Sequence, residues 1–339
     1  MTTTIALSTN SCIVLGCDSL GTISLPLVRT RELFNQLFDG KGNHKLDATG
    51  NPVYLTPDML MSLSRSVPSN QIPAVTKLFS LDKDKKKKID AAALFAGVAA
   101  LGEKSLRTII GEFKESQPFD RWQSQGKISD LAKCLGDHIN KEYKAANEDL
   151  AMEIILAGYS KNSREPEIFK IKINNGVDPE ITEENKSPEK FKVVFGGQYD
   201  VIERVVDGID LQGFGAIVQQ TEIALSKYRE KLTETLNLKG ITEVLPEYKD
   251  YGDIGQFFEY PFEFSRLSSE IRYFSEQAAI DFVEFLVELM IKSQQFSNQI
   301  PTVGGDIHVG LIIAHEGFRL ITKEHYRSKE HSVPKHKED

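Results

Sequence analysis

Hydrophobic and polar residues alternate at the start of the chain in the manner of two short strands. Apolar side chains occupy alternate positions of residues 3–8, and residues 12–17 form a continuous apolar run. The turn-forming residues 9–11 separate the two segments. The pattern predicts an N-terminal hairpin whose second strand ends at Asp18.

The next part of the chain loses this regularity and then recovers it. Residues 21–73 contain scattered glycines and prolines, which predicts an insertion made of loops and short helical pieces. Apolar residues return over 74–81 and again over 89–97, with a charged run between them. These two segments predict a second hairpin.

The remaining elements follow from the period of the apolar positions. Apolar residues three and four positions apart predict helices over 106–113, 131–143, 202–209, 225–236 and 282–290. Further apolar runs predict strands over 152–159, 168–173, 191–195, 307–313 and 318–321. Because strands and helices do not alternate singly, the order favours an α+β fold of antiparallel sheets with helices packed outside them.

Composition excludes several classes of protein. The 339 residues are 40% hydrophobic and 27% charged, which is typical of a globular protein of one enlarged domain or two. A net charge of -8 makes nucleic acid an unsuitable partner, and no apolar stretch is long enough to predict a membrane span. The three cysteines lack metal or disulfide spacing, so we expect a cytoplasmic protein without a metal or cofactor.

The second residue suggests a specific chemistry. A small residue after the initiator permits removal of Met1, which would leave Thr2 as the first residue. An N-terminal threonine carries its own general base in the free α-amine, and this activates a hydroxyl that is otherwise a weak nucleophile. Taken alone, Thr2 is more often a β-prone residue of a terminal strand.

The surrounding residues resemble a known family. Thr2 to Leu7 followed by Val14 to Ser19 is similar to the start of catalytic proteasome subunits, with a spacing of 18 - 2 = 16 from Thr2 to Asp18. Residues 75–79 resemble the strand that carries the catalytic lysine in that family, and residues 96–100 resemble its glycine–alanine step. The chain is most similar to the bacterial proteasome-like proteins of this family.

The resemblance implies a fold and a set of catalytic residues. The fold would be a four-layer αββα sandwich of the N-terminal-nucleophile hydrolase type. Thr2 would be the nucleophile, Lys77 would place its ammonium beside the hydroxyl, and Asp18 would hold that lysine. The backbone N–H of Gly97 would face the developing oxyanion.

Substrate binding and assembly also follow from the resemblance. Phe95 and Ala99 match positions that line the substrate pocket of the family, and a pocket lined by Phe95 would favour apolar side chains. The substrate would be a peptide or protein, and copies of the chain would associate, as members of the family do in rings. No ATPase partner can be named from the sequence.

The sequence also departs from the family pattern. The serine expected before the third helix aligns with Gln198, and of the late Asp-x-x-Ser-Gly-Gly motif only Gly304 and Gly305 are retained. Thr302 could partly replace the lost serine. These departures leave a second hypothesis open, in which the chain is a catalytically weak or inactive scaffold of the same fold.

The domain organisation follows from these segments. We expect a hydrolase domain over 1–322 that contains the insertion at about 21–73. Residues 323–339 are nearly all charged or polar, which predicts a disordered tail.

Overall fold

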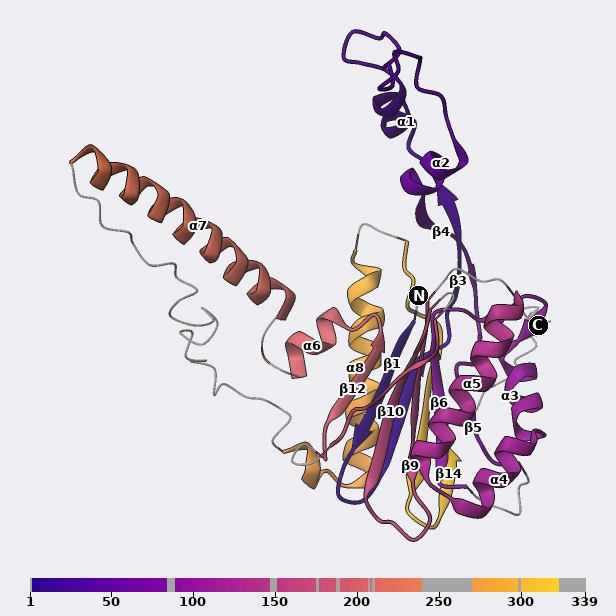
Figure 1. The fold of residues 1–339 in the computed structure, drawn as a ribbon. Helices are drawn as coiled ribbons and strands as arrows, with labels where there is room; N and C mark the ends of the chain where they lie inside the picture. Colours follow the sequence, from indigo (N-terminus) through magenta and orange to yellow (C-terminus); the bar gives the residue numbers. More distant parts are fainter. Residues whose placement is uncertain are drawn as a thin grey trace, which may run out of the picture.

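The fold is described from a computed structural model of the chain (Figure 1). It describes residues 2–83, 89–146, 151–174, 177–186, 190–206, 208, 211–239, 270–297 and 300–322. The predicted tail at 323–339 and the state of Met1 lie outside the described residues.

Two antiparallel five-stranded sheets form the centre of the protein. The first sheet has the order β12-β1-β2-β13-β14. Its strands are β1 (Thr3–Ser8), β2 (Ile13–Asp18), β12 (Val193–Gly197), β13 (Ile307–Ile313) and β14 (Gly317–Leu320). The second sheet has the order β11-β10-β9-β6-β5. Its strands are β5 (Leu78–Ser80), β6 (Ala91–Ala96), β9 (Met152–Tyr159), β10 (Pro166–Ile173) and β11 (Glu180–Glu183).

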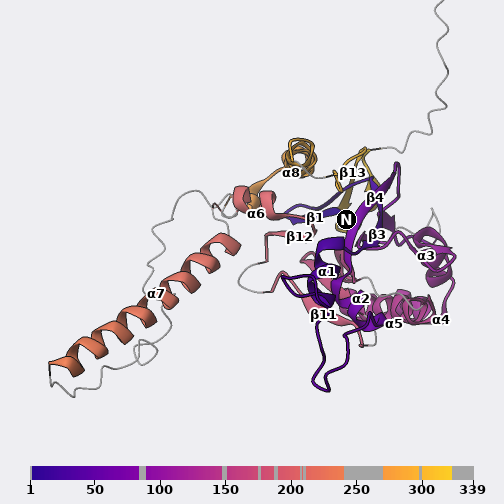
Figure 2. The same cartoon turned by 90° about the horizontal axis from the view of Figure 1, so that it is seen from above.

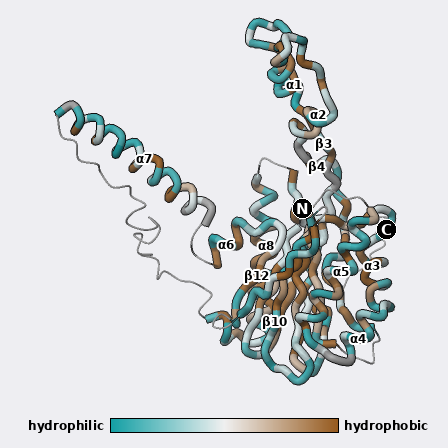
Figure 3. Tube along the Cα trace, viewed as in Figure 1, coloured by the Kyte–Doolittle hydropathy of each residue, from teal (hydrophilic) through white to brown (hydrophobic). Residues whose placement is uncertain are grey.

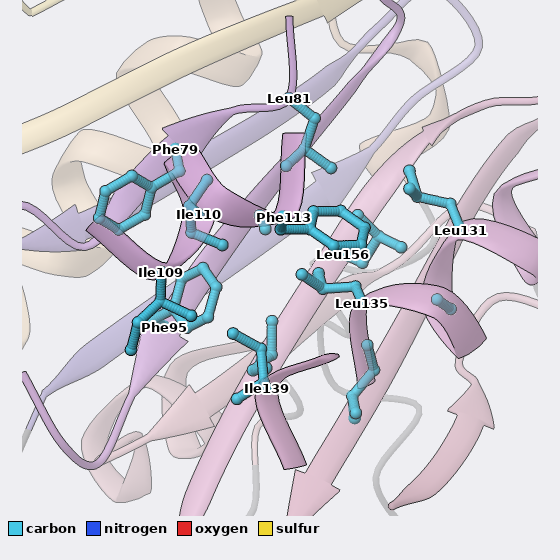
Figure 4. Packing of buried hydrophobic residues seen from close by; sticks show 14 of the residues in the cluster. Phe79, Leu81, Phe95, Ile109, Ile110, Phe113, Leu131, Leu135, Ile139 and Leu156 are labelled. Atoms are coloured by element: carbon cyan, nitrogen blue, oxygen red, sulfur yellow. The ribbon is translucent and has the colours of Figure 1, made fainter. Parts of the chain in front are cut away.

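Three helices cover one face of the second sheet. They are α3 (Leu106–Lys114), α4 (Gln117–Gln125) and α5 (Ile128–Ala146). Their apolar faces pack on the sheet in a cluster that includes Phe113, Leu135 and Leu156 (Figure 4). Ser105 and Ser116 cap the first two helices by accepting hydrogen bonds from backbone N–H groups. The short strands β7 (Ala100–Leu101) and β8 (Lys104–Ser105) connect β6 to α3.

Two other helices cover the first sheet. They are α6 (Asp200–Val206) and α8 (Glu276–Gln295), the latter preceded by a 3₁₀ turn, Ile271–Tyr273. Gly16 in β2 allows α8 to approach closely, because a Cβ on Gly16 would lie 2.3 Å from Cγ1 of Val283. A third apolar cluster, containing Ala6 and Ala92, lies between the two sheets. Figure 2 shows α8 on one side of the strands and α3–α5 on the other.

Two segments project from this body. The first, here called the arm, is a ribbon of β3 (Gly21–Leu27) and β4 (Arg65–Ile72) that carries α1 (Thr30–Leu37) and α2 (Pro57–Leu63). The second is α7 (Leu211–Leu238), which extends away from the sheets in both views (Figures 1 and 2). Hydrophobic residues concentrate in the two sheets, whereas the arm and α7 carry many hydrophilic ones (Figure 3).

The structure confirms a mixed α+β fold of antiparallel sheets. Two strands, β9 and β13, have the predicted bounds. The arm differs from the expected loops, since β3 and β4 pair with each other along its base. The short helix α4 and the edge strand β11 were also not predicted, because neither has a long apolar run. Among the described helices, none is long and apolar enough to cross a membrane.

Candidate active site

Thr2 lies immediately before β1 and is only 5% exposed. Its carbonyl oxygen accepts a hydrogen bond of 2.8 Å from the backbone N–H of Gln198, at the end of β12. Gly197 has a φ of +72°, and a Cβ there would lie 1.9 Å from the Thr2 oxygen. Only glycine can therefore occupy the point where β12 approaches Thr2.

Asp18 is the best-connected side chain near Thr2. It ends β2 and is fully buried. Its Oδ1 accepts from the backbone N–H of Thr3 at 3.0 Å, and its Oδ2 accepts from the N–H groups of Leu20 and Gly304, both at 3.1 Å. The carboxylate thus ties the start of β1 to the loop before β13. A buried carboxylate is stable only with such donors around it.

Lys77 supplies the charge that balances Asp18. It lies just before β5, is 4% exposed, and donates from Nζ to Asp18 Oδ1 at 2.9 Å and to the Leu20 carbonyl at 2.7 Å. The ammonium and the Thr3 N–H therefore meet on one carboxylate oxygen. Two of its three donors are assigned among the described residues, which leaves one for a neighbouring group.

Gly97 follows β6 and is exposed. Its φ is +111°, and a Cβ there would lie 2.5 Å from the Ala151 carbonyl oxygen. The preceding residue, Ala96, comes close to the first sheet, since its Cβ lies 3.4 Å from the position that a Cβ on Gly197 would take. The end of β6 thus lies beside the same glycine that contacts Thr2.

The two residues predicted to line a substrate pocket are placed differently. Phe95 is 1% exposed and packs edge-on against Phe79, with ring centroids 5.4 Å apart, in the cluster that faces α3 and α5 (Figure 4). Ala99 is exposed in the segment that leads to β7. Phe95 therefore does not reach the surface beside Ala99, and the pocket assignment stays a prediction.

Gln198 occupies the position where a serine was expected, and it accepts hydrogen bonds from two threonines. Gln198 Oε1 accepts from the Thr302 hydroxyl at 2.8 Å, and the Gln198 carbonyl accepts from the Thr3 hydroxyl at 2.7 Å. Gln294 of α8 completes this group by accepting from the Thr302 N–H at 2.7 Å. Sequence analysis missed Gln294, because a polar residue near the end of an amphipathic helix carries no distinguishing signal.

An ion pair beside the site was also missed. Glu153 Oε2 accepts from the Gly197 N–H at 2.9 Å, and its Oε1 lies 3.2 Å from Lys170 Nζ. Lys170 in turn donates to the Phe195 carbonyl at 2.6 Å. The pair fastens β12 to the second sheet. A single acidic residue inside the apolar run 152–159 was the available signal.

Comparison with known proteins provides little further information. No family model matches the sequence, and no curated protein is significantly similar to it. Among solved structures, Anbu (ancestral beta-subunit) from Yersinia bercovieri is similar with a TM-score of 0.41 and 9% identity, over 95% of this chain and 88% of that chain. An Anbu (Gly-1) mutant from Hyphomicrobium sp. strain MC1 gives 0.40 and 9%, over 96% and 89%.

These comparisons correct the predicted family. The predicted assignment of the chain to the bacterial proteasome-like family is wrong, because no family model matches the sequence and the solved structures are only distantly similar. The resemblance rested on a few short motifs, and residues such as an N-terminal threonine or a strand-ending aspartate occur in unrelated chains. The functional argument therefore depends on the geometry of Thr2, Asp18 and Lys77. Among the described residues, no cluster of His, Cys, Asp and Glu could hold a metal ion.

Proposed function

We propose that the chain is a threonine-dependent peptide or amide hydrolase that uses Thr2 as its nucleophile after removal of Met1. The observation that carries this proposal is the shared oxygen of Asp18. It accepts both the backbone N–H of Thr3 and the ammonium of Lys77, all in a buried setting. A buried ion pair beside a buried threonine at the chain start is costly, and catalytic groups are a common reason for such an arrangement.

The proposed reaction has two balanced steps. The α-amine of Thr2 takes the hydroxyl proton as the oxygen attacks the substrate carbonyl carbon, and the proton then passes to the leaving nitrogen as the carbon–nitrogen bond breaks. This leaves an ester on Thr2 and releases an amine. Water, deprotonated by the same amine, attacks the ester carbonyl carbon. The amine then returns the proton to the Thr2 oxygen as the carbon–oxygen bond breaks, which releases a carboxylic acid and restores Thr2.

The neighbouring residues would assist at fixed positions. The ammonium of Lys77 favours the alkoxide character that develops on the Thr2 oxygen, and Asp18 holds that ammonium in place. The backbone N–H of Gly97 is proposed to donate to the oxyanion. Loss of one such donor typically raises the activation free energy of the reaction by about 2.7 to 4 kcal/mol. Phe95 and Ala99 are proposed to contribute to substrate binding, which requires Phe95 to move from its packed position.

The fold and assembly proposals accompany this function. We propose that the two sheets and their outer helices form a four-layer αββα sandwich of the N-terminal-nucleophile type within residues 1–322. Three apolar clusters support this, one between the sheets and one under each set of helices. Self-association of the chain is proposed as well.

The test is labelling with a peptide epoxyketone, which forms a ring only with a threonine that has both a free hydroxyl and a free α-amine. Intact-mass measurement should show that Met1 is absent and that one adduct forms on Thr2. Thr2→Ala should abolish both the adduct and the turnover of peptide amides. Thr182→Ala, an exposed threonine of β11, is the matched control and should behave as the wild type.

The outcomes separate the enzyme from the scaffold. An active chain that retains Met1 would contradict the proposal. A chain that lacks Met1 but gains no adduct would favour the alternative of a catalytically inactive scaffold with the same fold.

A further inference from the structure

The helix α7 is long and stands away from the two central sheets. It has 28 residues and extends away from the sheets in both views (Figures 1 and 2). A helix of this length spans roughly 42 Å at 1.5 Å per residue. Helices of this kind gain most of their stability by packing an apolar face, so a projecting one calls for a partner.

The sequence of α7 has the repeat of a coiled coil. Apolar residues recur every seven positions at Leu211, Val218, Leu225 and Leu232. The fourth residue of each heptad, the d position, is Phe214, Thr221, Tyr228 or Thr235. From Val218 to Thr235, these two sets form one stripe along the helix. Tyr228 is 66% exposed and Ile217, which borders the stripe, is 59% exposed.

The two threonines of the stripe are compatible with a buried seam. The hydroxyl of Thr221 donates to the Ile217 carbonyl at 2.8 Å, and that of Thr235 donates to the Lys231 carbonyl at 2.7 Å. Because each hydroxyl is satisfied within its own helix, burial of either side chain leaves no unpaired donor. The seam can therefore close on a second apolar surface.

The charges of α7 indicate what that surface is. The helix has three acidic residues and three basic ones, so two copies would not repel each other: Glu222, Glu230, Glu234, Lys227, Arg229 and Lys231. Glu222 and Arg229 are the two charged residues at the e position of the heptad, directly beside the seam.

We propose that α7 pairs with α7 of a second copy of this chain, antiparallel, with Leu225 of each copy beside Tyr228 of the other. In this register Glu222 of one copy lies opposite Arg229 of the second copy, twice by symmetry. Sliding the pair by one heptad would instead set Glu222 against Glu222. A parallel pair would set Glu222 and Arg229 against Ile217 and Ala224, so the charges select the antiparallel arrangement.

This interface does not depend on the chemistry of Thr2. Its test is the dissociation constant of the full-length dimer, measured by sedimentation over a range of concentrations. Glu222→Arg and Arg229→Glu each place like charges opposite one another, and each should weaken the dimer by about tenfold. The double variant in one chain should restore the wild-type value.

Mixing the two single variants gives a sharper result. A mixture of Glu222→Arg and Arg229→Glu chains should form heterodimers in preference to either homodimer, because both opposing pairs are then of opposite charge. Lys227→Glu and Glu230→Arg reverse charges on the outer face of α7 and are the matched controls. They should leave dimerisation unchanged.

Two results would overturn the proposal. One is a dimer that neither single variant weakens, which would show that copies associate through another surface. The other is a chain that stays monomeric at every concentration while the amides of α7 resist hydrogen exchange. That result would indicate that another part of the same chain covers the stripe.

Discussion

At the scale of single residues, the candidate site depends on Asp18. All four of its described partners are donors, namely three backbone N–H groups and the Lys77 ammonium. A carboxylate accepts on both oxygens, whereas an amide has one NH₂ group that cannot accept. Asp18 thus has to be charged and cannot be replaced by its closest isostere.

We therefore expect Asp18→Asn to impair both stability and labelling. In either amide orientation an NH₂ group would face donors, and the buried ammonium of Lys77 would lose its counter-charge. The free energy of unfolding should fall by about 3 kcal/mol in denaturant titrations. The epoxyketone should no longer label Thr2.

The control for this variant is Asp306→Asn, an exposed aspartate at the start of β13. It should change the free energy of unfolding by less than about 0.5 kcal/mol. Wild-type stability of Asp18→Asn would show that the charge of Asp18 is dispensable.

At the scale of elements, the end of β12 positions Thr2. Gly197 pairs with Thr3 in the sheet and donates to Glu153, while the following N–H, of Gln198, holds the Thr2 carbonyl. A strand can approach a neighbouring backbone this closely only where it has no side chain. The glycine is therefore a requirement of the site and not of the strand.

Two glycine variants separate backbone strain from this close approach. Gly197→Ala adds a Cβ that collides with the Thr2 carbonyl, so labelling should be lost and the protein destabilised. Gly102→Ala has a comparable φ of +57°, but its nearest contact would be an ordinary 3.5 Å to Ala146. It should cost only about 1 kcal/mol in unfolding experiments and retain labelling. Equal effects of the two variants would contradict this account.

The arm can be tested as a separate element. Thr22 and Gln71 are paired at its base, so residues 23–70 can be replaced by Asn-Gly, which closes a two-residue hairpin. Asp18 and Lys77 lie on either side of this pair and should still meet. We expect the shortened chain to fold, with a single thermal transition, and to keep labelling of Thr2.

Loss of folding in the shortened chain would show that the arm is part of the domain core. Folding with loss of labelling would show instead that the arm is needed to hold Asp18 beside Lys77.

At the scale of the whole molecule, small residues let the two sheets pack face to face. Ala6, Ala92 and Ala157 are fully buried in the cluster between the sheets. Closely packed interiors tolerate added volume poorly. The distance between the sheets therefore decides whether Lys77, just before β5, reaches Asp18 at the end of β2. It likewise decides whether Ala96 in β6 lies beside Gly197 in β12.

Enlarging this interface should separate the sheets. Ala92→Leu should lower the free energy of unfolding by about 2 kcal/mol and slow labelling of Thr2. Ala145→Leu makes the same change on the exposed side of α5, where both residues favour a helix, and should be nearly neutral. Denaturant titration of both variants is the measurement, and a neutral Ala92→Leu would refute the tight interface.

Local pattern was sufficient for most of the strands and helices. The runs at 152–159 and 307–313 have the observed bounds because apolar residues within them are buried on both faces of a sheet. The paired strands of the arm escaped detection because their polar and apolar residues do not alternate cleanly, and β11 is a short edge strand. Whether β3 and β4 pair depends on the contacts between the two strands more than on the sequence of either strand alone.

The sequence by itself determined most of the strands and helices outside the arm, because the period of apolar residues is a local property. It also indicated Thr2 and, through the resemblance to a family, the candidates Asp18, Lys77 and Gly97. Only the tertiary structure decided that the Lys77 ammonium meets Asp18 across a separation of 59 residues. It alone revealed Glu153 and Gln294 as partners of β12 and Thr302. It also placed Phe95 in the core. Such contacts depend on how sheets and helices pack, and no short stretch of sequence encodes that packing.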